Sequence, residues 1–321
     1  MSRLKTRTVL GAAVLLAALA VYSATFCRTV YVGDTGEMVT AAYSLGIPHP
    51  PGYPIFCLTG KLMSSVFPWG NAACKVNYTA CVFASAAVLM MYIFMLKLLQ
   101  FLRGTAAASD PWVAASTALC LAFSRTFWSQ ALMAKGCLYE INALLLLAIL
   151  WAILSWLDQI RTIGPRANHR LLYLASFLFG LTLANHHTMI PISAAFLFLI
   201  LSESASRQRL RDPRLLLDMA LCVLLGVSLY LYLPVRSWTN PLINWSDPKN
   251  FDRTVYHIMR KQYGLVNDMP RTASLFAQQF FAYIKGLSVQ VNLVIIVAIA
   301  DTVFLWKRNK VLFFAFAYIF F

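Results

Sequence analysis

Two carboxylates stand three residues apart just after the first long apolar segment of the chain. They are Asp34 and Glu37, in the sequence Gly33-Asp34-Thr35-Gly36-Glu37, and the whole protein has only 12 acidic side chains among 321 residues. Carboxylates serve as general acids and bases and as ligands of cations. We therefore interpret this segment as the core of an active site at the surface of a membrane.

A rigid run follows the two acids, with the sequence His49-Pro50-Pro51-Gly52-Tyr53-Pro54. Each proline fixes its own φ angle and restricts the preceding residue to extended geometry, whereas Gly52 permits a turn or a close backbone approach. The run is consistent with a preorganised wall of a substrate site that presents His49 and Tyr53. It is equally consistent with a stiff turn that leads into a helix, with His49 as the cap.

The two acids also have a simpler interpretation. Residues 35–45 have a helical composition and Gly46 is a typical stop signal, so Asp34 would be the N-cap of a short helix and Glu37 its third residue. Asp-x-x-Glu in that position resembles a capping box. The scarcity of acids, the place at the bilayer surface and the rigid run behind the helix favour an active site, and a capping bond would be compatible with one.

The elements that must position these residues are transmembrane helices. The chain is 60% hydrophobic and 12% charged, whereas soluble domains carry about 25% charged residues. Its apolar runs are continuous, which excludes a closed β-barrel, and many are long enough to cross a bilayer as helices. We predict an all-α polytopic membrane protein with spans at residues 8–26, 73–99, 111–127, 138–157, 171–185, 188–203, 215–234 and 280–306.

Basic residues predict the orientation of these spans. The net charge is +15, and Lys and Arg cluster in the loops between alternate spans, as they do on the cytoplasmic side of membrane proteins. With a cytoplasmic N-terminus, the outer face receives a first outer loop at 27–72, turns at 128–137 and 185–188, and a last outer loop at 235–279. Both long loops carry the polar motifs, which places the predicted chemistry outside the cytoplasm.

Two shorter apolar runs complete the prediction. Residues 54–67 are expected to form a helix that lies in the outer interface. Residues 311–321 are too few to cross the bilayer. We therefore expect a single transmembrane domain over residues 1–321 that is cut within a ninth helix.

Further polar residues fall at the outer ends of spans. Asn185, His186 and His187 form one group, and ionisable residues at membrane depth are functional candidates. A histidine with Asp34 or Glu37 could bind a divalent ion, but adjacent histidines on a helix diverge, and no metal is favoured. The simpler interpretation of these side chains is packing.

The last outer loop carries basic and aromatic side chains, among them Arg236, Arg260 and Tyr263. Arginine donates paired hydrogen bonds to phosphate, so a phosphate site is one interpretation and solvated loop charge is the other. Cys57 and Cys74 could pair in an oxidising compartment, although the sequence does not specify a disulfide.

Taken together, these segments resemble the signature of a multi-pass membrane family of GT-C glycosyltransferases. That family includes the endoplasmic-reticulum protein O-mannosyltransferase that acts on plexin-type receptor domains, and many bacterial relatives. The resemblance covers roughly residues 25–265. It is carried by Gly33–Glu37, Ala41–Pro54, Phe123–Ala131, Tyr139–Ala143, Gly180–Thr188, Tyr232–Arg236, Asn240–Pro241, Asn244–Pro248 and Arg260–Gly264.

One segment departs from the family pattern. Many relatives have an acidic residue shortly before the element that reads Tyr139-Glu140-Ile141-Asn142 here. This chain has Ala134-Lys135-Gly136-Cys137-Leu138 in that place, with the acid displaced to Glu140. The role of that acid is therefore not carried over to this protein.

The resemblance implies a membrane glycosyltransferase that moves mannose from a polyprenyl-phosphate donor to a Ser or Thr hydroxyl of a protein, with inversion, and that needs no cofactor. Its implied partners are the donor, the protein acceptor and membrane lipids, without nucleic acid, in the bacterial plasma membrane, or in the endoplasmic reticulum of a eukaryote. Asp34 is then the catalytic base, and Glu37 orients Asp34 or the acceptor. The implied substrate-binding residues are His49, Tyr53, Asn185, His186, His187, Arg236, Arg260 and Tyr263.

Two other functions remain open at this point. A transporter or flippase for a lipid-linked or anionic solute would explain the basic outer loops and the histidines, although such proteins tend to place their polar breaks at mid-bilayer. A non-catalytic scaffold subunit is the third interpretation. Transfer activity in detergent would separate an enzyme from a transporter, because transport needs a sealed vesicle.

Overall fold

The protein is described here by a computed structural model, which covers residues 3–264, 272–291 and 302–320. Over these residues the regular elements are helices, and the extended pairing is limited to an isolated bridge between Ile47 and Asn244. The all-α prediction is confirmed. The α-helices are α1 (Arg3–Thr25), α2 (Thr35–Ser44), α3 (Pro54–Val66), α4 (Ala72–Arg103), α5 (Asp110–Ala122), α6 (Arg125–Gln130), α7 (Cys137–Ile163), α8 (Arg170–Leu183), α9 (Met189–Leu201), α10 (Ser204–Arg209), α11 (Pro213–Val227), α12 (Tyr232–Ser237), α13 (Phe251–Ile258), α14 (Ala273–Val291) and α16 (Lys310–Phe320).

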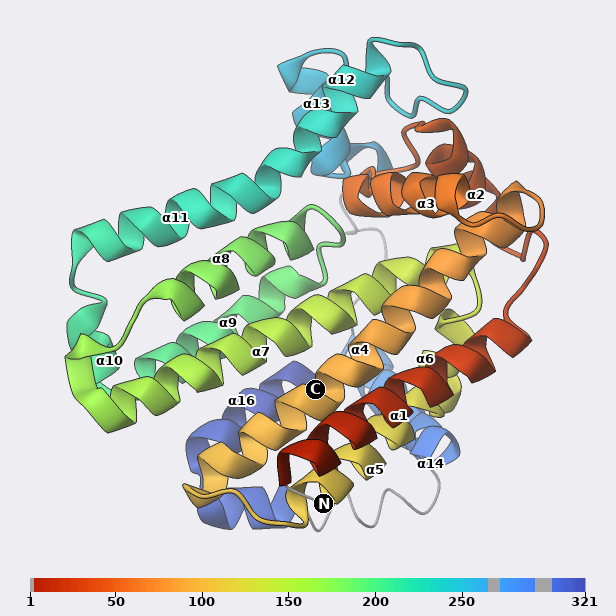
Figure 1. Ribbon diagram of the computed structural model, residues 1–321. Helices are drawn as coiled ribbons and strands as arrows, with labels where there is room; N and C mark the ends of the chain where they lie inside the picture. The colour runs from red at the N-terminus through yellow and green to blue at the C-terminus, as the bar shows by residue number, and fades with distance from the viewer. Residues whose placement is uncertain (1–2, 265–271, 292–301, 321) are drawn as a thin grey trace.

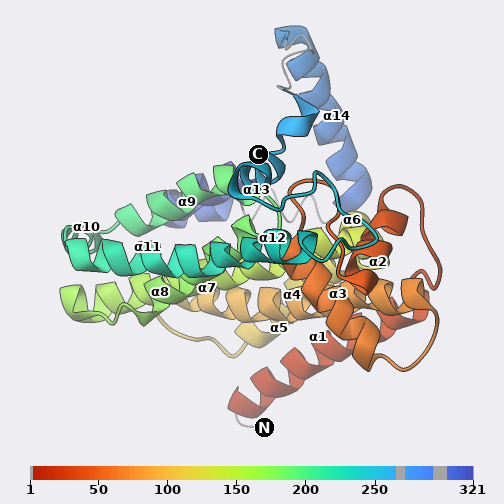
Figure 2. The same ribbon diagram turned by 90° about the horizontal axis from the view of Figure 1, so that it is seen from above.

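Two long helices, α4 and α7, pack against each other at the centre of the bundle (Figure 1). α8 packs on α7 and α11 packs on α8, whereas α1 and α5 pack on α4 from the other side. The side chains of Trp156 and Leu154 on α7 are fully buried in this centre, next to Phe94 of α4. Figure 2 shows α14 projecting away from the bundle.

Among the described residues, four helical segments are long and apolar enough to cross a bilayer, namely Leu4–Thr25, Ala72–Arg103, Ala134–Ile163 and Pro213–Ser237. The expected spans at 171–185 and 188–203 form α8 and α9, of 14 and 13 residues, which is shorter than the ~20 residues of a full crossing. The expected span at 111–127 is divided. α5 ends at Ala122 and α6 begins at Arg125, because the intervening Ser124 adopts extended backbone with ψ 140°.

The structure describes only part of the C-terminal region for which two helices are predicted. The predicted span 280–306 begins within α14, and its residues 292–301 lie outside the described part of the chain. The predicted ninth helix is seen as α16, which packs on α9. That the domain is cut within this helix stays a prediction.

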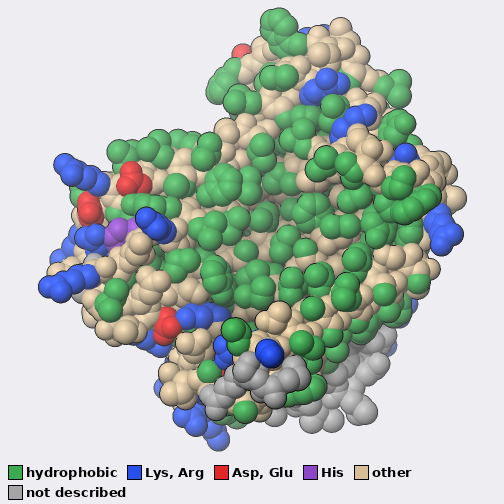
Figure 3. All heavy atoms as spheres, in the orientation of Figure 1, with side chains coloured by type: hydrophobic (Ala, Val, Ile, Leu, Met, Phe, Trp, Pro, Cys, Tyr) green, Lys and Arg blue, Asp and Glu red, His purple; other side chains and the backbone are tan. Residues whose placement is uncertain are grey.

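The surface of the bundle suits a membrane. Figure 3 shows hydrophobic side chains across the middle of one face, with Lys and Arg gathered at the end of the bundle where α10 lies. Leu16 of α1 and Leu224 of α11 are each 62% exposed. Such side chains would be covered by lipid in a bilayer, where apolar surface carries no penalty.

Small residues allow α8 and α11 to approach closely. A Cβ atom at Gly180 would lie 2.2 Å from the carbonyl oxygen of Val223, and one at Gly226 would lie 2.6 Å from that of Phe177. Close backbone contact at glycine is a common device for packing membrane helices. It brings the C-terminal end of α8, where the histidine pair follows, against the helix that leads to the last outer loop.

The two segments that were predicted as outer loops, 27–72 and 235–279, are joined at one end of the bundle. The N–H of Ile47 donates to the carbonyl of Ile243 at 2.7 Å, and the N–H of Trp245 donates to the carbonyl of Ile47 at 3.2 Å. The hydroxyl of Tyr232 donates to the carbonyl of Gly46 at 2.7 Å. Segments almost 200 residues apart therefore form one unit around the rigid run.

A buried amide connects a third segment to this unit. The side-chain nitrogen of Asn77 in α4 donates to the carbonyls of Cys27 and Thr29 at 2.8 and 2.9 Å. Its side-chain oxygen accepts the N–H of Ala134 at 2.8 Å. Asn77 has no exposed surface, so it fixes the start of the first outer loop against the segment that carries Lys135.

The suggested disulfide is not formed. Cys57 and Cys74 are both free and buried. Burial raises the pKa of the Cys57 thiol to about 12, so this side chain stays protonated at neutral pH. Cys57 instead packs as a small apolar residue among Met38, Phe56 and Val76.

Candidate active site

The side chain of Asp34 is partly exposed to solvent and pairs with a lysine. Its carboxylate lies 2.6 Å from Nζ of Lys135, and the two side chains are 45% and 37% exposed. The hydrogen bond from Lys135, reinforced by its charge, lowers the pKa of Asp34. Asp34 is the N-cap residue of α2, but its side chain makes no capping bond. The interpretation of Asp34 as a side-chain cap is therefore wrong.

Glu37 also does not cap α2, because its carboxylate binds His49. Its Oε1 accepts the backbone N–H of His49 at 2.6 Å, and both carboxylate oxygens lie 3.1 Å from Nδ1 of His49. The side chains of Glu37 and His49 are 23% and 16% exposed. The carboxylate thus holds the start of the rigid run against α2 from twelve residues away.

The contact chain continues from His49 to Tyr53. Nε2 of His49 lies 3.2 Å from the hydroxyl of Tyr53. In a neutral imidazole the hydrogen on Nδ1 faces Glu37, so Nε2 accepts the hydrogen of the Tyr53 hydroxyl. Glu37, His49 and Tyr53 form a connected series, which we call the Glu-His-Tyr chain.

The backbone of the rigid run turns at two residues that adopt positive φ angles. Gly52 has φ +95° and Tyr53 has φ +44°. A Cβ atom at Gly52 would lie 2.6 Å from Cδ2 of Leu233 and 3.1 Å from Nε2 of His257. Glycine is therefore required at this turn on two grounds, conformation and space. Burial lowers the pKa of His257 to about 4, so a neutral imidazole packs under the turn.

His186 meets the Glu-His-Tyr chain from the turn between α8 and α9. Its ring is stacked on that of Tyr53 with 6.0 Å between centroids, and it lies 5.7 Å from the ring of Tyr139. Burial, assisted by the charge of Arg260, lowers the pKa of His186 to about 4. His186 is therefore neutral at physiological pH. Its Nδ1 accepts the backbone N–H of Thr188 at 3.3 Å, which leaves the hydrogen on Nε2 to donate.

Two predicted substrate ligands beside His186 have structural partners. Asn185 is fully buried and donates to the carbonyl of Leu138 and to the side-chain oxygen of Asn142, both at 2.8 Å. Nε2 of His187 lies 3.2 Å from the hydroxyl of Tyr230. Both residues fix the turn between α8 and α9, and only His186 of the three joins the cluster around Tyr53.

The guanidinium of Arg236 is engaged with the backbone of α2. Its Nε donates to the carbonyl of Leu45 at 2.8 Å, and a terminal nitrogen donates to that of Ser44 at 3.4 Å. α2 ends at Ser44, so these carbonyls belong to the group that a helix leaves unpaired at its C-terminus. The geometry makes Arg236 a residue that positions α2.

Arg260 lies beside the histidine turn. Its backbone has φ +57°, and its guanidinium lies over the ring of Tyr263 at 5.3 Å from the centroid. After burial, the charge of Arg260 is the second cause that lowers the pKa of both His186 and His187. Arg260 and Tyr263 are both exposed, so the last outer loop brings a cation and an aromatic ring to the cluster.

The described residues contain no group of three or more His, Cys, Asp and Glu side chains that could hold a metal ion. Glu37 and His49, which the sequence left open as metal ligands, bond to each other. What the cluster offers chemically is one exposed carboxylate with a lysine and a second carboxylate that orients an imidazole and a phenol. This arrangement suits proton transfer to and from a hydroxyl.

Sequence reasoning missed three residues of this region as site residues. Lys135 was noted only as a departure from a pattern, yet it is the partner of Asp34. Tyr139 contacts His186, and its place in a motif beside a polar turn was the available signal. Glu140 was also set aside, although an acid in the first turn of an apolar span is a functional candidate, and it is buried and lines a cavity together with Tyr139.

The family model "Protein O-mannosyl-transferase TMEM260 N-terminal domain" matches residues 34–210, which is more than half of the chain. The chain is 28% identical over 253 residues to a mouse protein named protein O-mannosyl-transferase TMEM260, a match that covers 78% of this chain and 34% of the mouse protein. It is 26% identical over 283 residues to the protein of that name from Dictyostelium discoideum, covering 84% and 33%.

No solved structure matches the chain. The chain spans about a third of the length of the two relatives. The matched range begins at Asp34 and includes the Glu-His-Tyr chain, Lys135 and His186. This protein belongs to the family defined by the TMEM260 N-terminal domain.

Proposed function

We propose that this chain holds the catalytic region of a membrane glycosyltransferase. The enzyme would move mannose from a polyprenyl-phosphate donor to a Ser or Thr hydroxyl of a protein on the extracytoplasmic face of the membrane. The observation that carries the proposal is the Asp34 carboxylate, which is 45% exposed and precedes α2 at one end of the bundle (Figure 1). The names of the relatives support protein O-mannosylation as the activity.

The reaction is a single displacement at the anomeric carbon of the donor. The bond from this carbon to the phosphate oxygen breaks, and a bond to the acceptor oxygen forms on the opposite face. The acceptor proton passes to Asp34, and the lipid phosphate leaves with the electron pair of the broken bond. One displacement inverts the configuration, and the sugar has oxocarbenium character in the transition state.

The lowered pKa of Asp34 fits a late proton transfer. Lys135 keeps the carboxylate ionised, which also makes it a weaker base than a free aspartate. An acceptor hydroxyl becomes far more acidic once its oxygen has begun to bond to the anomeric carbon. Asp34 would then take the proton as the new bond completes, with Glu37 keeping α2 and His49 in register.

Cationic side chains around the cluster would stabilise the leaving phosphate. Lys135 is 37% exposed and already pairs with an anion, and the guanidinium of Arg260 lies in the exposed last outer loop. Positive charge at a leaving phosphate lowers the barrier of its departure. Because Lys135 is held at the base, and an inverting displacement puts the leaving phosphate on the opposite face of the sugar, we propose Arg260 as the contact to the donor phosphate, with Tyr53, His49, His186 and Tyr263 around the sugar or the acceptor.

The proposal includes the setting of the enzyme. Residues 1–321 would form a single GT-C-like transmembrane domain with outer loops 27–72 and 235–279, in contact with membrane lipids. The bacterial plasma membrane is the proposed location, or the endoplasmic reticulum in a eukaryote. Basic residues at the ends of α4, α7 and α10 and at the start of α11 support an N-terminus in the cytoplasm.

Transfer by the purified full-length protein in detergent tests the function. Polyprenyl-phosphate mannose with a radioactive sugar and a Ser/Thr peptide should yield a labelled peptide whose anomeric configuration is opposite to that of the donor. Uptake or flipping by sealed vesicles, with no transfer in detergent, would favour a transporter. A product with retained configuration would contradict the single displacement.

A further inference from the structure

A buried carboxyl group outside the cluster lacks a partner. The side chain of Glu140 in the first turn of α7 is only 1% exposed, and its Oε2 has no hydrogen-bond partner among the residues that the structure describes. Burying a carboxyl group without hydrogen bonds costs several kcal/mol. A buried polar group without a partner needs a physical explanation, and a ligand in the adjacent cavity would be one.

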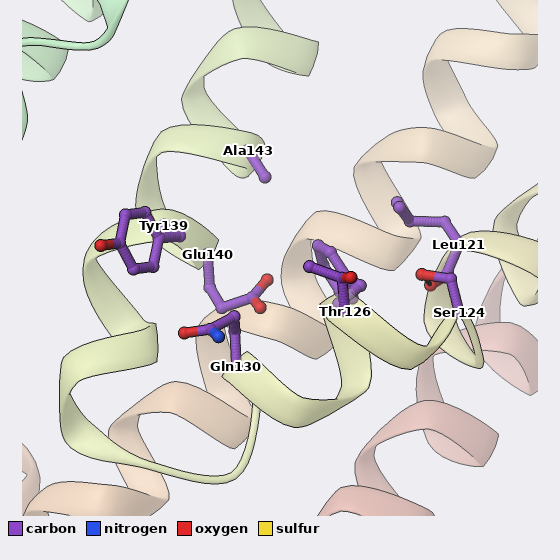
Figure 4. Close-up of a pocket in the computed structure, with 8 residues that line it drawn as sticks. Leu121, Ser124, Thr126, Gln130, Tyr139, Glu140 and Ala143 are labelled. Atoms are coloured by element: carbon purple, nitrogen blue, oxygen red, sulfur yellow. Dashed lines mark hydrogen bonds between the residues drawn. The ribbon is translucent and has the colours of Figure 1, made fainter. Parts of the chain in front are cut away.

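Glu140 lines a cavity of about 600 Å³ between α6 and α7. Figure 4 shows its carboxylate pointing into this space, with Thr126 and Gln130 of α6 close by. Ser124 adds a third polar side chain, and Phe127 and Tyr139 add aromatic rings to the lining. The volume lies within the range of small-molecule sites, about 300–1,000 Å³.

The mixture of groups discriminates among ligand classes. An alkyl chain would leave Glu140 unpaired. A metal ion would need further acidic or histidine ligands, and the described residues provide no such group here. A sugar ring has hydroxyl donors along its edge and C–H faces that pack on aromatic rings. It therefore matches a carboxylate, an amide and hydroxyls beside Phe127 and Tyr139.

We propose that this cavity is a sugar subsite in which Glu140 accepts hydrogen bonds from the hydroxyls of one monosaccharide ring. The cavity adjoins the candidate active site, because Tyr139 lines it and also lies 5.7 Å from the ring of His186. The choice of mannose as probe rests on the proposed function, but the subsite does not require Asp34 to be the base. The sugar can come from the lipid-linked donor or from a glycan of the acceptor.

Saturation-transfer NMR with methyl α-mannoside tests this subsite on the full-length protein in detergent. The wild-type protein should transfer saturation to the sugar. Glu140→Gln keeps the shape but replaces one acceptor oxygen of the carboxyl group with a donor nitrogen, and it should weaken binding about tenfold, roughly the loss of one hydrogen bond. Displacement of the sugar by polyprenyl-phosphate mannose would assign the site to the donor, and displacement by a mannosylated peptide would assign it to the acceptor.

Three further variants keep the result interpretable. Ala143→Phe fills the cavity from α7 with Glu140 intact and should abolish the sugar signal. Glu203→Gln, at the opposite end of the bundle, should leave the signal unchanged. Asp34→Asn should retain the signal while it loses transfer, which separates failure of the subsite from failure of the proposed base.

Thermal unfolding gives a second readout. Because an unpartnered buried carboxyl group destabilises a fold, Glu140→Gln should unfold at the same or a higher temperature than wild type. A clearly lower unfolding temperature would show that Glu140 is a structural residue and would overturn the proposal. So would an equal sugar signal in wild type and Glu140→Gln, or no signal in wild type.

Discussion

Glu37→Gln perturbs the contact that joins α2 to the rigid run. The carboxylate accepts the His49 N–H at 2.6 Å and faces Nδ1 with both oxygens at 3.1 Å. Glutamine can still accept the backbone N–H, but its neutral amide loses the charge that strengthens both contacts. Hydrogen bonds to charged groups contribute about 1.5–3 kcal/mol. Because Glu37 and His49 are partly exposed, we expect a loss of about 1–2 kcal/mol.

Two measurements check this magnitude. A loss of that size should lower the unfolding temperature in detergent by roughly 2–8 °C, taking about 2–4 °C per kcal/mol for a chain of this size. The transfer rate should fall by roughly 10- to 100-fold, because His49 and Tyr53 would no longer be held in place. Residual activity is expected, since Asp34 is untouched.

Glu203→Gln is the matched control. Glu203 pairs with Arg161 at 2.8 Å, and the two side chains are 29% and 40% exposed, so its loss should cost less than about 1 kcal/mol. This pair lies at the opposite end of the bundle (Figure 1) and should not affect transfer. If Glu37→Gln matched wild type in both unfolding temperature and transfer rate, the Glu-His-Tyr chain would have no role in the site.

Three further predictions follow from individual contacts. Lys135→Met removes the ammonium that lowers the pKa of Asp34, so the acidic limb of the pH–rate profile should move to higher pH. Because the pKa of Asp34 is lowered in the folded state, the pair stabilises the fold at pH values above the ordinary aspartate pKa of about 3.9, and this stabilisation is lost as the pH falls through the folded-state pKa. Lys135→Met should remove this contribution from acid-unfolding curves. An acidic limb that does not move would argue against the pair. Gly52→Ala forces a side chain into φ +95° with a 2.6 Å contact to Leu233, and a loss of about 2–4 kcal/mol is expected in unfolding experiments; a wild-type melting curve would show that the turn differs in solution. Arg236→Ala leaves the C-terminal carbonyls of α2 unpaired, and we expect the free energy of unfolding to fall by about 1–3 kcal/mol. Arg236→Lys should not restore it, because an ammonium group lacks the paired donors of the guanidinium. Normal stability with weakened donor binding would instead indicate that Arg236 binds the donor phosphate.

The apolar pattern was enough to predict the class of fold. The span predicted at 73–99 is helix α4, Ala72–Arg103, and the interfacial helix predicted at 54–67 is α3, Pro54–Val66. The break between α5 and α6 was not predicted, because the run 111–127 stays apolar across Phe123 and Ser124 while the backbone turns there. Hydropathy averages over a window and does not register a two-residue interruption.

The partners of the site residues were beyond sequence reasoning. Asp34 and Glu37 fit a capping pattern locally, and their actual partners, Lys135 and His49, are 101 and 12 residues away. Arg236 fitted a phosphate ligand by residue type, but the close approach of α12 to the end of α2 gives it backbone carbonyls instead. Residue type restricts what a side chain can do, and only the tertiary contacts select among the options.

The rate of a single turnover by Asp34→Asn tests the central claim most directly. The variant keeps the size of the side chain but cannot accept the acceptor proton, and Asp218→Asn, which removes a carboxylate that accepts from Tyr173 at 2.9 Å, serves as the control. With donor and acceptor both bound, Asp34→Asn should transfer sugar about 10²–10⁴-fold more slowly than wild type, while Asp218→Asn transfers it at the wild-type rate. A wild-type single-turnover rate for Asp34→Asn would contradict the assignment of Asp34 as the base.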